Sequence, residues 1–79
     1  MKTLSAFGES KTIKGEKCNV ILIEREDSYE AFLEQPGYPM EFMYGIPKTD
    51  VSPEFAMKLA KGNAKHYYRT EEERNVPSV

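Results

Sequence analysis

The chain has 79 residues, of which 39% are hydrophobic and 30% charged, and its formal net charge is −2. This length supports one domain with a thin core, because a chain of this size buries about 60–65% of the surface that its unfolded form exposes. The four Phe and five Tyr argue against a disordered chain, and the small negative charge excludes a general attraction to nucleic acid or to an anionic membrane.

Cys18 is the only cysteine and His66 the only histidine, so the sequence excludes an internal disulfide and a zinc site with four nitrogen or sulfur ligands. Small domains without such cross-links often gain stability by association. We therefore expect residues 1–79 to form a single domain that binds no metal and no cofactor. We also expect this domain to form a homodimer or to bind another protein.

Residues 3–13 combine weakly alternating apolar positions with Gly8, which predicts an edge strand or a bulged strand. The next four residues, Lys14-Gly15-Glu16-Lys17, predict a tight turn, since glycine adopts positive φ at little cost.

Residues 18–25 are the clearest strand of the chain, because three of the four residues in the apolar run from Val20 to Ile23 are β-branched. A continuous apolar run predicts burial on both faces and therefore a central position in the sheet. One face of this strand would carry Cys18, Val20 and Leu22, and the other Ile21 and Ile23. A single helix covers only one of these faces, so something else must cover the second.

Residues 27–35 fit two elements equally well. As a helix, Asp27 would cap the first turn and Glu30 would complete a capping box. As a strand, the alternating residues Tyr29, Ala31 and Leu33 would pair with residues 18–25. In either case Pro36-Gly37 ends the element.

Residues 40–46 predict a strand that lies at an edge of the sheet, because prolines 39 and 47 bracket it. Simple alternation would direct one set of side chains to one face, namely Met40, Phe42, Tyr44 and Ile46, and would direct Glu41, Met43 and Gly45 to the other.

Residues 52–72 predict the main helix, with Ser52 as N-cap and Pro53 in the first helical position. A stripe at helical spacing would lie on the sheet: Phe55, Ala56, Leu59, Ala60, Asn63, Ala64 and Tyr67. Gly62-Asn63 would bend or end the helix, or allow a close contact. Residues 74–79 are expected to fray. The predicted fold class is α+β, an antiparallel sheet of three or four strands packed against one C-terminal helix, with a short second helix at 27–35 as an alternative.

No motif in the sequence predicts catalysis. The helical neighbours three or four residues from His66 are Gly62, Asn63, Arg69 and Thr70, and none is a carboxylate that could orient the imidazole. Cys18 has apolar neighbours, which predicts a buried thiol rather than a reactive one. We therefore expect no catalytic, cofactor-binding or metal-binding residues, and we expect the chain not to be an enzyme.

Two sets of side chains could form a binding surface. Spare aromatic residues favour contact with a protein partner, namely Phe42, Tyr44, Tyr67 and Tyr68. Basic residues spaced three or four apart could bind nucleic acid or another anionic ligand, namely Lys58, Lys61, Lys65 and Arg69. The acids at 71–73 weaken this alternative. The sequence therefore favours a small interaction or regulatory module that acts through protein–protein contacts. Because no signal peptide or membrane span is visible, we expect a cytoplasmic location.

Overall fold

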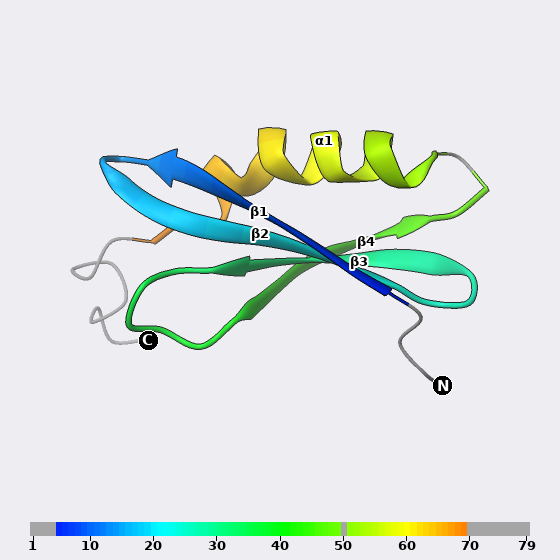
Figure 1. Cartoon of the computed structure of the whole chain (residues 1–79), viewed down its shortest axis with the longest axis horizontal. Coiled ribbons are helices and arrows are strands. Elements are labelled where there is room, and N and C mark those ends of the chain that lie inside the picture. Colours follow the sequence, from blue (N-terminus) through cyan, green and yellow to red (C-terminus); the bar gives the residue numbers. More distant parts are fainter. Residues whose placement is uncertain (1–4, 50, 70–79) are drawn as a thin grey trace, which may run out of the picture.

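The computed structural model describes residues 5–49 and 51–69. Four antiparallel strands follow one another along the chain in the order β1-β2-β3-β4, and one helix then lies across one face of the sheet (Figure 1). This arrangement confirms the predicted α+β class. The elements are β1 (Ser5–Ile13), β2 (Glu16–Glu24), β3 (Ser28–Glu34), β4 (Glu41–Pro47), helix α1 (Pro53–Asn63) and a 3₁₀ turn η1 (Ala64–His66).

Two of the turns contain a glycine with a positive φ angle. Lys14 and Gly15 form the two-residue loop between β1 and β2, with φ angles of 51° and 81°, which is the geometry that suits the twist of a tight hairpin. After β3, the Tyr38 N–H donates to the Gln35 carbonyl across Pro36-Gly37 at 3.1 Å, and Gly37 has a φ of 81°. Proline followed by a glycine with positive φ is typical of a type II turn.

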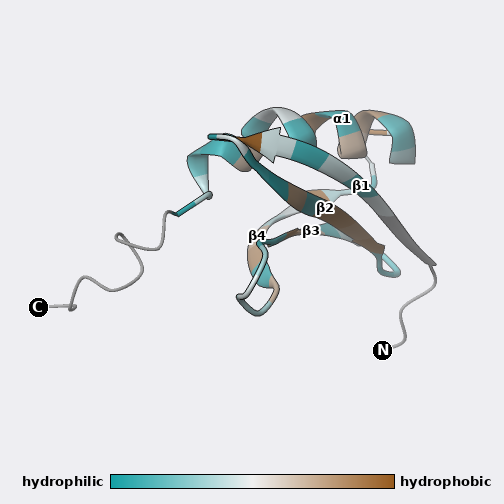
Figure 2. Cartoon of the chain, turned by 60° about the vertical axis from the view of Figure 1, so that its left-hand side comes forward, coloured by the Kyte–Doolittle hydropathy of each residue, from teal (hydrophilic) through white to brown (hydrophobic). Residues whose placement is uncertain are grey.

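β2 lies between β1 and β3, so the predicted central strand is confirmed. Its apolar run is the brown stretch of β2 in Figure 2. Val20 and Leu22 are fully buried on the side covered by α1, where they join the core with Ala31 of β3. β1 is an edge strand, as predicted, and it pairs with β2 without interruption from Ser5 to Ile13.

Residues 27–35 contain strand β3, so the alternative of a short helix there is wrong. β3 pairs with β2 in a register that sets Leu33 beside Val20 and Ala31 beside Leu22. This pairing buries the alternating residues Tyr29, Ala31 and Leu33 next to the core residues of β2. The capping signal of Asp27 and Glu30 does not outweigh that burial, because a helix of only about eight residues is marginal by itself.

β4 is the second edge strand, as predicted, but its side chains do not alternate as predicted. The register shifts between Ala31, which faces Tyr44, and Phe32, which faces Phe42, so Met43 is the extra residue of a β-bulge. Tyr44 and Ile46 therefore lie on the side of α1, where Ile46 and Met43 are buried, while Phe42 lies on the opposite side.

Helix α1 begins as predicted, because the Ser52 hydroxyl accepts a hydrogen bond from the Phe55 N–H at 3.2 Å. It ends at Asn63, which confirms the prediction that Gly62-Asn63 could end the helix, since glycine is a poor helix former. The 3₁₀ turn η1 follows at Ala64, so the predicted α-helix does not continue through the described residues 64–69, and residues 70–72 lie outside the described part of the chain. The buried face is narrower than the predicted stripe, since Ala56, Ala60 and Ala64 are fully buried whereas Phe55 is 49% exposed. These small side chains let the helix pack closely on the sheet. The predicted frayed tail, residues 74–79, lies outside the described residues.

Hydrogen bonds with two residues outside the helix hold the segment after η1, residues 67–69, against the sheet. The Gln35 side-chain amide donates to the Arg69 carbonyl at 2.6 Å and accepts from the Arg69 N–H at 3.2 Å. These two bonds give polar partners to the Gln35 side chain, which is only 2% exposed. The Tyr68 hydroxyl donates to the Glu16 carboxylate at 2.6 Å, and this bond, together with burial, raises the pKa of Tyr68 to about 12. Both contacts close the end of the core beside the β1–β2 turn.

Candidate interaction surface

The sheet face opposite α1 is uncovered in the described part of the chain, and we call it the open face (Figure 1). Strand alternation and register assign its residues. They include Gly8, Ser10 and Thr12 of β1, Lys17, Asn19, Ile21 and Ile23 of β2, Glu30, Phe32 and Glu34 of β3, and Phe42 and Gly45 of β4.

An apolar row crosses the middle of the open face. Gly8, Ile21, Phe32 and Phe42 are successive partners across all four strands. The rings of Phe32 and Phe42 pack edge to face with centroids 5.5 Å apart and an interplanar angle of 69°. Phe42 is nevertheless 57% exposed, and Ile21 and Phe32 are only partly buried. The row therefore keeps apolar surface in contact with water.

Polar side chains border the apolar row at both ends of the strands. At one end, the Ser10 hydroxyl donates to the Asn19 amide oxygen at 3.0 Å, and the Asn19 amide nitrogen donates to Glu34 at 2.8 Å. At the other end, the Arg25 Nε lies 2.9 Å from a carboxylate oxygen of Glu30. An apolar centre with a polar rim is typical of a protein-binding surface.

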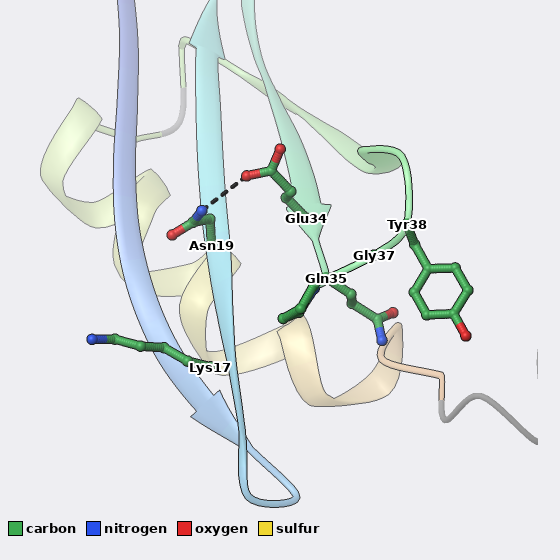
Figure 3. A pocket seen from close by; sticks show the side chains of 7 residues that line it. Lys17, Asn19, Glu34, Gln35, Gly37 and Tyr38 are labelled. Atoms are coloured by element: carbon green, nitrogen blue, oxygen red, sulfur yellow. Dashed lines mark hydrogen bonds between the residues drawn. The ribbon is translucent and has the colours of Figure 1, made fainter.

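A shallow pocket of about 220 Å³ opens at the Asn19–Glu34 end of this face (Figure 3). In that view Lys17 extends toward β1 while Tyr38 points away on the far side, and the Asn19–Glu34 bond lies between them. The Gln35 amide in its wall is already bonded to Arg69. The pocket is smaller than the roughly 300–1,000 Å³ of typical small-molecule sites.

A second hollow, of about 420 Å³, lies between β1 and the start of α1. Its described lining combines Gly8, Pro53 and Met57 with the carboxylates of Glu9 and Glu54. Glu9 is already paired with Lys61 at 2.6 Å. Neither hollow brings together a nucleophile, a base and an orienting group among its described lining residues, which is the arrangement that covalent catalysis needs.

The four aromatic residues predicted as a partner surface occupy three separate places. Phe42 is on the open face, whereas Tyr44 is on the side of α1, stacked on Tyr67 with centroids 5.9 Å apart. The Tyr44 hydroxyl accepts from the Asn63 amide at 3.2 Å. Tyr68 is buried at the far end of the core. The bulge in β4 and the end of α1 separate residues that simple periodicity would have grouped.

The four basic residues predicted as an anion-binding surface are also dispersed. Lys58 and Lys65 are exposed, but Lys61 is paired with Glu9 of β1. Arg69 lies beyond both α1 and η1, where Gln35 holds its backbone. A continuous basic stripe along one helix is therefore not formed.

Cys18 is buried and unpaired, as predicted, and burial followed by the nearby charge of Glu16 raises the pKa of its thiol. This raised pKa disfavours the reactive thiolate. His66 lies exposed in η1. The described residues hold no group of His, Cys, Asp and Glu side chains arranged to bind a metal ion. None of the helices that the structure describes has the length and apolar character needed to cross a membrane.

The sequence prediction missed Phe32 as a surface residue. Its signal was present: once residues 27–35 are taken as a strand, Phe32 falls on the face opposite Tyr29, Ala31 and Leu33. Its pairing with Ile21 then marks the centre of the open face.

We compared the chain with protein-family models, with curated proteins and with solved structures, and none of the three comparisons found a match. The function proposed below therefore depends on the residues of this chain alone.

Proposed function

We propose that this chain is a non-enzymatic interaction module that binds a protein through the open face of its sheet. The observation that carries the proposal is the uncovered apolar row of Ile21, Phe32 and Phe42. Burying apolar surface is favourable by about 25 cal/mol per Å², so a partner that covers this row gains binding energy from each of these side chains.

The composition of the open face supports a protein as the partner. Aromatic residues are enriched in the cores of protein interfaces, and they often contribute most of the binding energy. The row crosses all four strands, whereas small-molecule sites are concave and local. Hydrogen-bonded polar pairs at both ends would form the rim of the contact.

The state of the two possible catalytic side chains also favours binding over catalysis. The Cys18 thiol is buried, and its raised pKa keeps it protonated. His66 takes part in none of the ion pairs between described residues. An unpaired, buried thiol suits a reducing compartment, and we propose that the module acts in the cytoplasm.

Binding of nucleic acid or of another anionic ligand is the alternative that the sequence left open. The Lys61–Glu9 pair weakens it, because the salt bridge offsets one of the four predicted positive charges. We therefore place the functional contact on the open face.

Site-specific photo-crosslinking tests the proposal. A photoreactive phenylalanine analogue is placed at Phe42 in one variant and at Phe55 in a second, and each is expressed in the cell that naturally makes the protein. Phe55 is the matched control because it is about as exposed, but it lies on α1. We expect a protein adduct from position 42 and none from position 55. Absence of a protein adduct from position 42, or the same adducts from both positions, would overturn the proposal.

A further inference from the structure

We infer that the protein covering the open face is a second copy of this chain, an inference that rests on the proposed function above. The argument comes from the size and charge pattern of the open face. A homodimer buries the same patch on both copies, so the patch must be complementary to itself.

The side chains of the apolar row become larger from β1 to β4. It begins at β1 with Gly8, which has no side chain, continues through Ile21 and Phe32, and ends at β4 with the exposed ring of Phe42. A side chain at Gly8 would meet no atom within 4 Å of its Cβ, so open space lies above this glycine.

One two-fold axis matches large residues to small ones. If the axis runs along the strands, midway between β2 and β3, then β1 of one copy lies over β4 of the other. Phe42 then sits over the partner's Gly8, and Phe32 over the partner's Ile21. Two sheets packed face to face keep their strands within about 30° of each other, which this axis allows.

The same axis gathers charges of both signs at one end of the interface, because Lys17 and Glu34 of both copies lie there. β2 carries Lys17 at the end of the open face where β3 carries Glu34. In the dimer, Lys17 lies one row beyond the partner's Glu34, and two residues along a strand span roughly 7 Å, which the flexible lysine stem can bridge. Within the single chain Glu34 accepts a hydrogen bond from the neutral Asn19 amide, and Lys17 is in none of the ion pairs of the described residues.

Other axes fit the pattern less well. An axis across the strands, through the apolar row, would place Glu34 over the partner's Glu30, and like charges at an interface disfavour association. The axis along the strands avoids this contact, and the two Glu34 residues that it sets in one row are balanced by the two Lys17 residues one row beyond them. It therefore combines the size match and the charge match in one geometry.

Complementary charge reversals test the inference on the purified full-length protein. Sedimentation velocity should show that the unmodified chain dimerises, and that Lys17→Glu and Glu34→Lys each weaken dimerisation roughly tenfold or more. An equimolar mixture of these two variants should recover association, because each copy then presents charges opposite to those of its partner. Lys58→Glu is the control, since it makes the same charge change on exposed α1 and should leave the dimer unchanged.

The substitution Gly8→Thr gives a second test, in which a loss of dimerisation would not result from misfolding of the single chain. Threonine favours strand conformation, and Gly8 has open space around its Cβ, so the single chain should remain folded and at least as stable. The new side chain would occupy the place of the partner's Phe42, and dimerisation should weaken roughly tenfold.

Two results would overturn the inference: a chain that stays monomeric at every concentration, or variants whose mixture associates no better than either variant alone. If position 42 still crosslinks to a different protein in those cases, the proposed function stands and only the second copy as partner is rejected. If position 42 gives no protein adduct at all, the proposed function fails with it.

Discussion

Leu22 and Ile21 are neighbours on β2, yet they have different surroundings. Leu22 is fully buried beneath α1, whereas Ile21 lies partly exposed on the open face. Small alanines on the helix allow close packing over Leu22, whereas Ile21 lies between Gly8 and Phe32, which leave it partly exposed. The face beneath α1, which we call the covered face, therefore holds the single chain together. The open face is left available for binding.

The largest expected effect is a loss of unfolding free energy that differs between the two faces. Leu22→Ala removes a fully buried side chain from a packed core and should cost about 2–5 kcal/mol of unfolding free energy. Ile21→Ala at a protein concentration too low for association should cost roughly 1 kcal/mol, because Ile21 is already partly hydrated. Urea titration measures both values. Equal losses under these conditions would show that the open face is also covered within the single chain.

A smaller effect is expected at the end of the covered face. Gln35→Ala leaves the N–H and carbonyl of Arg69 without the side chain that pairs with both. Losing such buried partners should cost about 1–3 kcal/mol of unfolding free energy. Hydrogen exchange at the Arg69 amide should become faster in this variant. An unchanged exchange rate would show that the Gln35 amide does not hold this segment.

The smallest effect concerns the Tyr68–Glu16 bond and depends on pH. The pKa of Tyr68 is raised from 10.0 to about 12 in the folded chain, so the stabilising contribution of Tyr68 is complete below pH 10 and is lost as the pH rises through 12. The stability difference between the unmodified protein and Tyr68→Phe should therefore be constant up to about pH 10 and shrink above it. Urea titrations of both proteins over this range measure it. A difference that does not vary with pH would contradict the assigned bond.

Much of the fold was predictable because its signals are local. The apolar run from Val20 to Ile23 predicted the central strand, Ser52 and Pro53 predicted the start of α1, and Pro36-Gly37 predicted the end of the element that is β3. Each of these signals is contained in a few adjacent residues, so they could be recognised without knowledge of the contacts between distant segments.

The features that the sequence did not predict correctly depend on contacts between distant segments. The bulge at Met43 reverses the faces of the residues before it, because side chains alternate with a period of two and one extra residue inverts the pattern. The identity of β3 was decided by pairing with β2 rather than by its own sequence. The Gln35–Arg69 and Glu16–Tyr68 bonds join residues far apart in the chain, and no local pattern indicates them.

For the candidate surface, sequence reasoning found that Ile21 and Ile23 needed a cover other than the helix, and it named Phe42. It grouped Phe42 with Tyr44 because it applied a regular period to a strand that contains a bulge. It missed Phe32 because residues 27–35 had two possible structures, and only one of them places Phe32 beside Ile21.

Hydroxyl-radical footprinting tests the central claim most directly, because it reports the solvent exposure of individual side chains in the intact protein. Phe42 is 57% exposed and Phe55 49% exposed in the single chain, so both should be labelled at similar rates in dilute solution. As the protein concentration rises, labelling of Phe42 should fall while labelling of Phe55 stays constant. Equal labelling of the two residues at every concentration would contradict burial of the open face by a second copy.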